Sequence, residues 1–231
     1  MADYKKYLNL FKKCLSKDYQ HTNEGGSFAY EVVDDTLQIW LQHSNGVSDW
    51  IANLDFPKKP YKDMERTWWV HRGFLRVWKS IEPYLKEVIK NPEIKHIQII
   101  GYSHGAALAV LCHEYCVFNR HDCTIEGYGF GCPRVLYGKY SKEILDRWNT
   151  FTVIRNYDDI VTHLPPKLFG YRDVGQVVNL TPKGYYRKKE KSLKEKFVAG
   201  HRPENIIEQL ELNILSVAHD SFINYLVDSK K

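Results

Sequence analysis

The 231-residue chain lacks any apolar run long enough to cross a membrane as a helix, which takes about 20 residues. The N-terminal segment carries Lys5, Lys6, Lys12 and Lys13 and has no apolar core of the kind that a secretory signal needs. Internal repeats and low-complexity segments are absent as well. We therefore expect a cytoplasmic or peripheral membrane protein, with secretion through a signal removed before residue 1 as the alternative.

Cysteine is scarce, and the odd number of five residues excludes complete pairing in disulfides. Cys112 and Cys116 are one helical turn apart in a segment that we expect to be a buried helix, which favours reduced thiols in the core. A metal site built from Cys112, His113 and Cys116 has no recognisable fourth ligand. The sequence therefore predicts no metal and no cofactor.

The net charge of +5 is modest for this length, but positive charge concentrates in one run. This run extends from Lys183 to Lys196 and has Tyr185 and Tyr186 near its start. Basic residues beside aromatic ones suit contact with an anionic membrane surface, and a solvated loop or helix face is the alternative. No nucleic-acid-binding motif accompanies the run, which disfavours a nucleic-acid partner. The oligomeric state is not readable from the sequence.

Length and periodicity indicate one domain spanning residues 1–231. Some segments repeat apolar residues at helical spacing, others are short β-branched runs, and the two kinds alternate along most of the chain. Such alternation predicts an α/β fold with a mainly parallel central sheet covered by helices. The predicted helices are near 4–15, 74–90, 104–118, 142–148 and 220–227, and the predicted strands are near 28–33, 37–41, 96–101, 124–130, 151–156 and 176–180.

One short motif carries most of the functional information. Ser103 stands between Gly101 and Gly105, after a β-branched run and before an alanine-rich segment, which is the pattern of a nucleophile elbow. The glycines leave room for a sharp strand-to-helix turn, and the N-terminus of the following helix directs amide groups at developing negative charge. The motif predicts a serine hydrolase, and a glycine-rich turn with an incidental serine is the alternative.

A serine nucleophile needs a histidine base, and the histidine needs a carboxylate to orient it. In folds with such an elbow these residues follow in the order serine, acid, histidine. A predicted strand leads into Asp158 and Asp159, and either aspartate fits on spacing alone. His219, just before an apolar segment near the C-terminus, is the favoured base, with His163 and His201 as competitors.

In chain order, five segments and a weaker match at His219 resemble the class 3 lipases: 44–56, 70–74, 101–106, 130–135 and 156–166. The resemblance implies an α/β-hydrolase fold with helices on both faces of the sheet, and ester hydrolysis without a cofactor. Carried over by position, it implies Ser103 as nucleophile, Asp159 as acid and His219 as base. It also implies the backbone N–H groups of Ser44 and His104 as donors to the oxyanion.

Three places depart from the family pattern. Gln42 and His43 stand where an Arg-Gly pair is usual, His104 follows the nucleophile where leucine is common, and Thr162-His163 replaces a proline and a basic residue. None of these changes removes a catalytic part. We expect the imidazole of His104 to face solvent or to be hydrogen-bonded, because a side chain at a helix start next to the serine points away from the hydroxyl.

A short amphipathic helix is predicted after the first oxyanion residue, with Val47, Trp50, Ile51 and Leu54 on one face. In the resembled lipases a lid over the acyl pocket occupies this position, which suggests a lid at about 45–58. An ordinary helix packed on the core is the alternative, since periodicity does not distinguish the two.

Three functional classes follow from the sequence. The leading one is hydrolysis of acylglycerols, with a lipid or small ester as substrate. The second is a phospholipase A or an esterase of soluble or feruloyl-type esters, because the same triad serves all of them. The third is a catalytically silent binding protein of the same fold, which the intact set of catalytic residue types disfavours.

Overall fold

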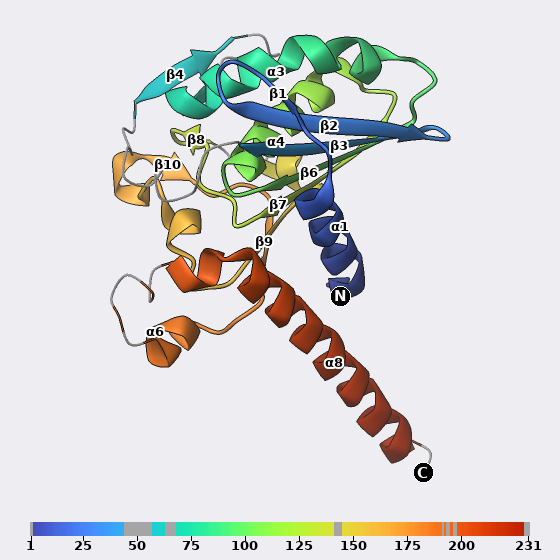
Figure 1. Ribbon diagram of the computed structural model, residues 1–231, viewed down its shortest axis with the longest axis vertical. Helices are drawn as coiled ribbons and strands as arrows, with labels where there is room; N and C mark the ends of the chain where they lie inside the picture. The colour runs from blue at the N-terminus through green and yellow to red at the C-terminus, as the bar shows by residue number, and fades with distance from the viewer. Residues whose placement is uncertain are drawn as a thin grey trace.

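The computed structural model describes residues 2–43, 57–62, 68–140, 145–190, 192, 195 and 198–228 (Figure 1). Within these, side chains are described except for His43 and residues 219–228. The predicted amphipathic helix, with Val47, Trp50, Ile51 and Leu54, lies outside the described residues. Of the predicted lid at 45–58, only the last two residues are described, and Lys58 begins a strand.

The central sheet has seven strands and is mainly parallel, as the sequence predicted. β3, β6, β7, β9 and β11 run parallel to one another, and the antiparallel strands β1 and β2 extend the sheet beyond β3. The strand order is β1-β2-β3-β6-β7-β9-β11. The strands are β1 Gln20–His21, β2 Gly26–Val33, β3 Thr36–His43, β6 His96–Tyr102, β7 Thr124–Phe130, β9 Phe151–Arg155 and β11 Gln176–Asn179.

A second, antiparallel sheet was not predicted, because its strands are only two to four residues long. It lies beside the central sheet, towards the left in Figure 1. Its strand order is β10-β8-β5-β4. The strands are β4 Lys58–Tyr61, β5 Trp68–His71, β8 Leu136–Tyr137 and β10 Tyr171–Arg172.

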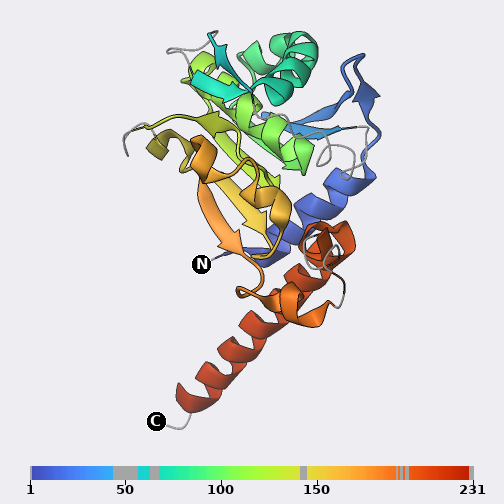
Figure 2. The ribbon, with the colours of Figure 1, turned by 90° about the vertical axis from the view of Figure 1, so that its left-hand side faces the viewer.

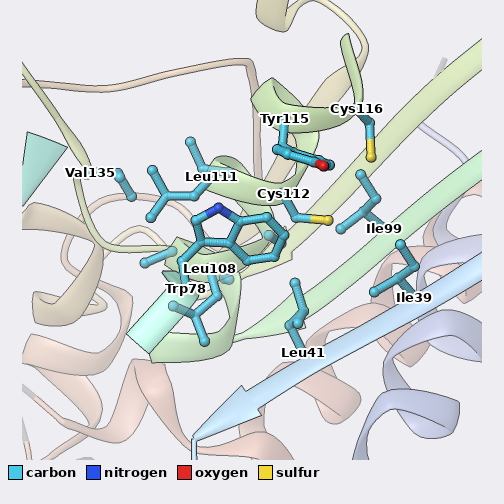
Figure 3. Packing of buried hydrophobic residues seen from close by; sticks show 14 of the residues in the cluster. Ile39, Leu41, Trp78, Ile99, Leu108, Leu111, Cys112, Tyr115, Cys116 and Val135 are labelled. Carbon is cyan, nitrogen blue, oxygen red and sulfur yellow. The ribbon is translucent and has the colours of Figure 1, made fainter. Parts of the chain in front are cut away.

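Helices cover both faces of the central sheet, each over its own apolar cluster. On one face α3 (Arg72–Lys90) packs on α4 (His104–Asn119), and Figure 3 shows Trp78 of α3 between α4 and strands β3 and β6. Helix α4 is buried on all sides from His104 to Cys116, which fits its position between α3 and the sheet. On the other face α1 (Tyr4–Ser16) packs against β6 and α8 (Pro203–Asp228). The remaining elements are short: η1 Asp146–Trp148, η2 Ile160–His163, η3 Lys167–Phe169, α6 Tyr185–Lys189 and η4 Ala199–His201.

The C-terminal helix was predicted to start at residue 220, and this was wrong. α8 begins at Pro203, a residue that suits the first helical position because its missing N–H would have no partner inside the helix. Ile206 and Leu210, one turn apart, are buried in the cluster beneath α1. In the segment predicted as a helix at 142–148, residues 145–148 are described, and they contain the single turn η1.

All five cysteines lie among the described residues, and all are free thiols. Cys112 and Cys116 lie in the buried part of α4, as predicted, and burial raises the pKa of the Cys112 thiol well above its ordinary value. Within the described ranges, no group of three histidine, cysteine or acidic residues is arranged to hold a metal ion. No helix in the described part of the chain is long and apolar enough to span a membrane.

Candidate active site

Ser103 forms the sharp turn between strand β6 and helix α4. Its backbone has φ 57° and ψ −122°, a conformation that is strained for a residue with a side chain. The neighbouring strand holds the turn in place, since the N–H of Ser103 donates to the carbonyl oxygen of Phe130 at 2.9 Å. The elbow predicted from the sequence is therefore present, with Ser103 at the end of the strand.

The two glycines of the motif are needed for close packing. A Cβ atom on Gly101 would lie 2.2 Å from the carbonyl oxygen of Gly105, and one on Gly105 would lie 2.0 Å from the carbonyl oxygen of Leu41 in β3. Both contacts are with backbone, which has little freedom to move away. The absence of side chains at these positions lets the first turn of α4 press against β6 and β3 and thereby fixes the elbow.

A hydrogen-bonded chain of three side chains starts at Ser103. Its Oγ lies 2.8 Å from Nε2 of His201, and Nδ1 of His201 lies 2.8 Å from Oδ2 of Asp159. His201 and Asp159 are 3 % and 0 % exposed. With its proton on Nδ1 the imidazole donates to the carboxylate, which leaves Nε2 to accept the serine O–H. This is the connectivity of a Ser-His-Asp triad.

The structure brings Asp159, and not Asp158, to the imidazole. The second oxygen of Asp159, Oδ1, accepts the N–H of Val161 at 2.9 Å, so the carboxylate is held from both sides. Asp158 instead accepts the N–H groups of Gly184 and Tyr186 at the start of α6, at 2.9 and 3.0 Å. The alternative that the sequence left open, that Asp158 contacts the base, does not fit this geometry.

The histidine in this chain of hydrogen bonds is His201, which corrects the prediction of His219. His219 lies in α8, 16 residues after the first residue of that helix, or about 24 Å along its axis. Figures 1 and 2 both show α8 projecting away from the body of the molecule. His201 stands just before α8, in the turn η4, and the order serine, acid, histidine is kept.

Tyr102, a residue to which the sequence analysis gave no role, holds His201 in place. Its ring stacks on the imidazole with centroids 5.2 Å apart and planes inclined by 22°, and its Oη donates to the carbonyl oxygen of His201 at 2.8 Å. Burial raises the pKa of Tyr102, so the phenol remains a donor. From the other side, Asn156 donates to the carbonyl oxygen of Gly200 at 2.8 Å. In the sequence, the only signal for this role was the position of an aromatic residue directly before the nucleophile.

The other histidines of the sequence analysis have different positions. Nε2 of His163 lies 3.0 Å from the carbonyl oxygen of Tyr157, to which it donates, away from Ser103. The ring of His104 is buried edge-on against Phe74, with centroids 4.9 Å apart, which excludes the solvent-facing one of the two settings expected for it. The backbone of His104 forms the first residue of α4, at the positive end of the helix dipole. The other predicted oxyanion residue, Ser44, lies outside the described residues.

The basic run from Lys183 to Lys196 is only partly described. Lys188 and Lys189 are exposed in α6, but Tyr186 is fully buried. Tyr185 packs edge-on against Tyr186 and accepts a hydrogen bond from Gln209 in α8 at 3.4 Å. The aromatic residues of this run therefore serve the packing of α6 on α8.

Comparison with known proteins identifies relatives of this chain. Residues 39–169, more than half of the chain, match the family model of lipase (class 3). The secreted mono- and diacylglycerol lipase 1 of Fusarium solani is 28% identical over 155 residues, which cover 64% of this chain and 45% of that protein. A lipase of Rhizomucor miehei is 28% identical over 150 residues, which cover 61% of this chain and 40% of that protein. The chain thus matches less than half the length of these two relatives.

The likeness extends to solved structures. That of the Rhizomucor miehei triacylglyceride lipase matches with a TM-score of 0.64 at 17% identity, over 89% of this chain and 98% of that one. At this identity the match shows the fold, which is the α/β-hydrolase fold implied by the sequence. The family match and the shared fold together show that the chain belongs to the class 3 lipase family.

Proposed function

We propose that this protein is a carboxylic ester hydrolase acting on acylglycerols, with Ser103 as nucleophile, His201 as base and Asp159 as the acid that orients it. The observation that carries the proposal is the pair of 2.8 Å contacts from His201, one to Ser103 Oγ and one to Asp159 Oδ2. Both the base and the acid are buried, where an oriented hydrogen bond is stronger than in water.

The reaction follows from these positions. Ser103 Oγ attacks the ester carbonyl carbon while Nε2 of His201 takes the serine proton, and the ester becomes a tetrahedral oxyanion. The imidazolium, stabilised by Asp159, gives its proton to the leaving alcohol as the carbon–oxygen bond breaks. Water then attacks the acyl-enzyme, with His201 again accepting a proton, and releases the carboxylic acid and the free serine.

The oxyanion needs donors that face the place where the negative charge develops. The backbone N–H of His104, at the start of α4 and next to Ser103, is one such donor in this proposal. The backbone N–H of Ser44, with its hydroxyl, is the second donor by resemblance to the family. Each is expected to lower the barrier by about 3 kcal/mol.

Acylglycerols are the proposed substrates because the relative from Fusarium solani is named a mono- and diacylglycerol lipase. A series of acyl chain lengths and head groups tests this choice: mono- and diacylglycerols should be cleaved faster than phospholipids or feruloyl esters. Preferential cleavage of a phospholipid would replace the substrate while leaving the triad in place.

We further propose that the protein works in a reducing compartment, in the cytoplasm or at a membrane surface. Five free thiols support this, four of them buried. Contact between the run from Lys183 to Lys196 and a membrane stays a prediction, and the lysines of α6 are exposed as this contact requires. A variant with four neutralised lysines in the run tests it.

The initial rate on p-nitrophenyl butyrate tests the proposed reaction, with wild type compared with Ser103→Ala. The variant should lose at least about a thousandfold in kcat, since removing the nucleophile disables the triad as a unit. Circular dichroism should show that it is folded. Equal rates for both proteins would contradict the proposal, and labelling of the wild type alone by a fluorophosphonate probe would identify the serine directly.

A further inference from the structure

Asp158, the aspartate that the triad does not use, is a buried carboxylate. Its side chain is 1 % exposed, and both of its oxygen atoms accept backbone hydrogen bonds, Oδ1 from the N–H of Gly184 at 2.9 Å and Oδ2 from that of Tyr186 at 3.0 Å. Burial of a carboxylate is costly unless its oxygens are hydrogen-bonded or its charge is paired. Nε of Arg187 lies 3.8 Å from Oδ1 and supplies positive charge. The carboxylate of Asp158 therefore holds the start of α6.

The contact of Asp158 is one of four that consecutive residues make with the ends of the stretch 181–201, which begins before α6 and finishes at the base. Two of the four hold the beginning of the stretch and two hold its end. The contacts join the N–H of Tyr157 to Oγ1 of Thr181 at 3.0 Å, Asp158 to Gly184 and Tyr186, Nδ2 of Asn156 to the carbonyl oxygen of Gly200 at 2.8 Å, and Oδ2 of Asp159 to Nδ1 of His201 at 2.8 Å. Both ends of the stretch are thus fixed to the four residues that include the acid.

The end of the stretch packs closely against the acid. A Cβ atom on Gly200 would lie 2.9 Å from the backbone nitrogen of Asp159 and 3.1 Å from its Cα atom. Gly200 directly precedes His201 in the chain. A small displacement of this backbone would therefore change the distance between Nδ1 of the base and the carboxylate of the acid.

A second route leads from α6 to the base through α8. Gln209 of α8 donates a hydrogen bond to Oη of Tyr185 in α6 at 3.4 Å. Helix α8 begins at Pro203, directly after the residue that follows His201. A contact that holds α6 in place therefore also steadies the backbone of the base from this side.

We propose that Asp158 is a positioning residue of the active site: by holding the start of α6, it fixes the part of the chain that places His201 between Ser103 and Asp159. The two neighbouring aspartates then have different tasks, since Asp159 binds the imidazole and Asp158 binds the segment that carries it. Asp158 acts through these contacts and not on the reacting atoms. The proposal rests on the proposed function, because it concerns the base that takes the proton of the serine.

Replacing Asp158 tests the proposal through kcat and KM on p-nitrophenyl butyrate. Asp158→Ala removes both acceptor oxygens and should lower kcat by about tenfold or more while KM stays within about twofold, because a displaced base slows the chemical step rather than substrate binding. Asp158→Asn keeps one acceptor oxygen, so its kcat should lie between those of the alanine variant and wild type.

Proton NMR measures the position of the base without any substrate. A proton held between Nδ1 of His201 and the carboxylate of Asp159 gives a low-field signal, which is identified by its absence in His201→Gln. In Asp158→Asn this signal should shift or broaden, because the distance between base and acid changes. If wild type cleaves no ester, the proposed function fails, and the low-field signal still decides whether Asp158 positions the base.

The matched control is Asp3→Ala, which removes another carboxylate that accepts a backbone N–H, that of Lys6 at 2.9 Å at the start of α1. This variant should keep the wild-type kcat and the wild-type low-field signal. Melting temperatures show which variants are folded, and Asp158→Asn decides if Asp158→Ala is not. An unchanged low-field signal in the folded Asp158→Asn protein would overturn the proposal, whatever its kcat.

Discussion

His201 is held in place by contacts to its ring and by a contact to its backbone. Ser103 and Asp159 bind its two nitrogen atoms, while Tyr102 stacks on the ring and fixes the backbone carbonyl. Tyr102 in turn packs edge-on against Phe11 of α1, with centroids 5.4 Å apart. The position of the base therefore depends on an aromatic residue outside the triad.

Substitution of Tyr102 separates its two contacts. Tyr102→Phe keeps the ring but removes one hydrogen bond, and we expect kcat to fall by about fivefold. Tyr102→Leu also removes the stacking and should lower kcat further, with an altered pH–rate profile because the imidazole is less well oriented. Initial rates across pH measure both effects. If the leucine variant matches wild type in rate and profile, Tyr102 is no positioning residue.

His113 predicts a dependence of stability on pH. Burial, with the nearby charge of Arg147, lowers its pKa from 6.5 to about 3. Below pH 6.5 the unfolded chain binds a proton at this site that the folded protein does not bind, so the free energy of unfolding falls as pH falls from 6.5 towards 3. Between pH 7 and pH 5 this histidine should account for a loss of about 2 kcal/mol.

The comparison for this effect is His113→Gln, measured by urea unfolding at both pH values. The variant lacks the titrating group, so its stability should change less between pH 7 and pH 5 than that of wild type. An equal change in both proteins would show that other groups cause the pH dependence.

At the scale of elements, the local sequence pattern was enough to predict the position of a long helix or strand. The hairpin of β2 and β3, the parallel strands and helices α1, α3 and α4 all lie near their predicted positions. The strands of the second sheet escaped notice because two to four residues carry too little periodicity. The predicted start of helix α8 was too late in the chain because the polar residues before and after Pro203 are typical of a loop.

The same error placed the base wrongly. His201 lies in a stretch whose composition is that of an exposed loop, yet it is buried by Tyr102, which is 99 residues away in the sequence. Ser103 was recognisable from its local motif, and Asp159 from the resemblance to the family, since spacing alone left Asp158 open as well. A contact between residues so distant in the chain has no local signature, so the choice among His163, His201 and His219 needed the fold.

Helix α8 offers a test of its own packing. Leu210 is buried beneath α1, whereas Leu212, two residues later, is exposed. Leu210→Ala should lower the free energy of unfolding by about 2–4 kcal/mol through the cavity it leaves, and Leu212→Ala by less than about 1 kcal/mol. Urea unfolding measures both. Equal losses in the two variants would contradict the packing of α8 against α1.

At the scale of the whole molecule, the fold is held by two apolar clusters, one on each face of the central sheet, and by no covalent cross-link among its cysteines. The triad is assembled from the ends of β6 and β9 and from the turn before α8. The geometry of the triad therefore requires the central sheet and the turn before α8 to be in place together.

Because its cysteines are free, the protein should have the same stability and activity with and without a reducing agent. The melting temperature and the rate of ester cleavage should be the same with and without dithiothreitol, since no disulfide contributes to stability. Alkylation of the denatured, unreduced protein, followed by mass spectrometry, should modify all five thiols. Fewer modified cysteines, together with a melting temperature lowered by reductant, would contradict the thiol state described above.

The proposed mechanism depends on His201 being the base, and one comparison tests this most directly. The rate on p-nitrophenyl butyrate should fall by at least about a thousandfold in His201→Ala and stay within about twofold of wild type in His219→Ala. The reverse result, with activity kept in His201→Ala and lost in His219→Ala, would contradict it.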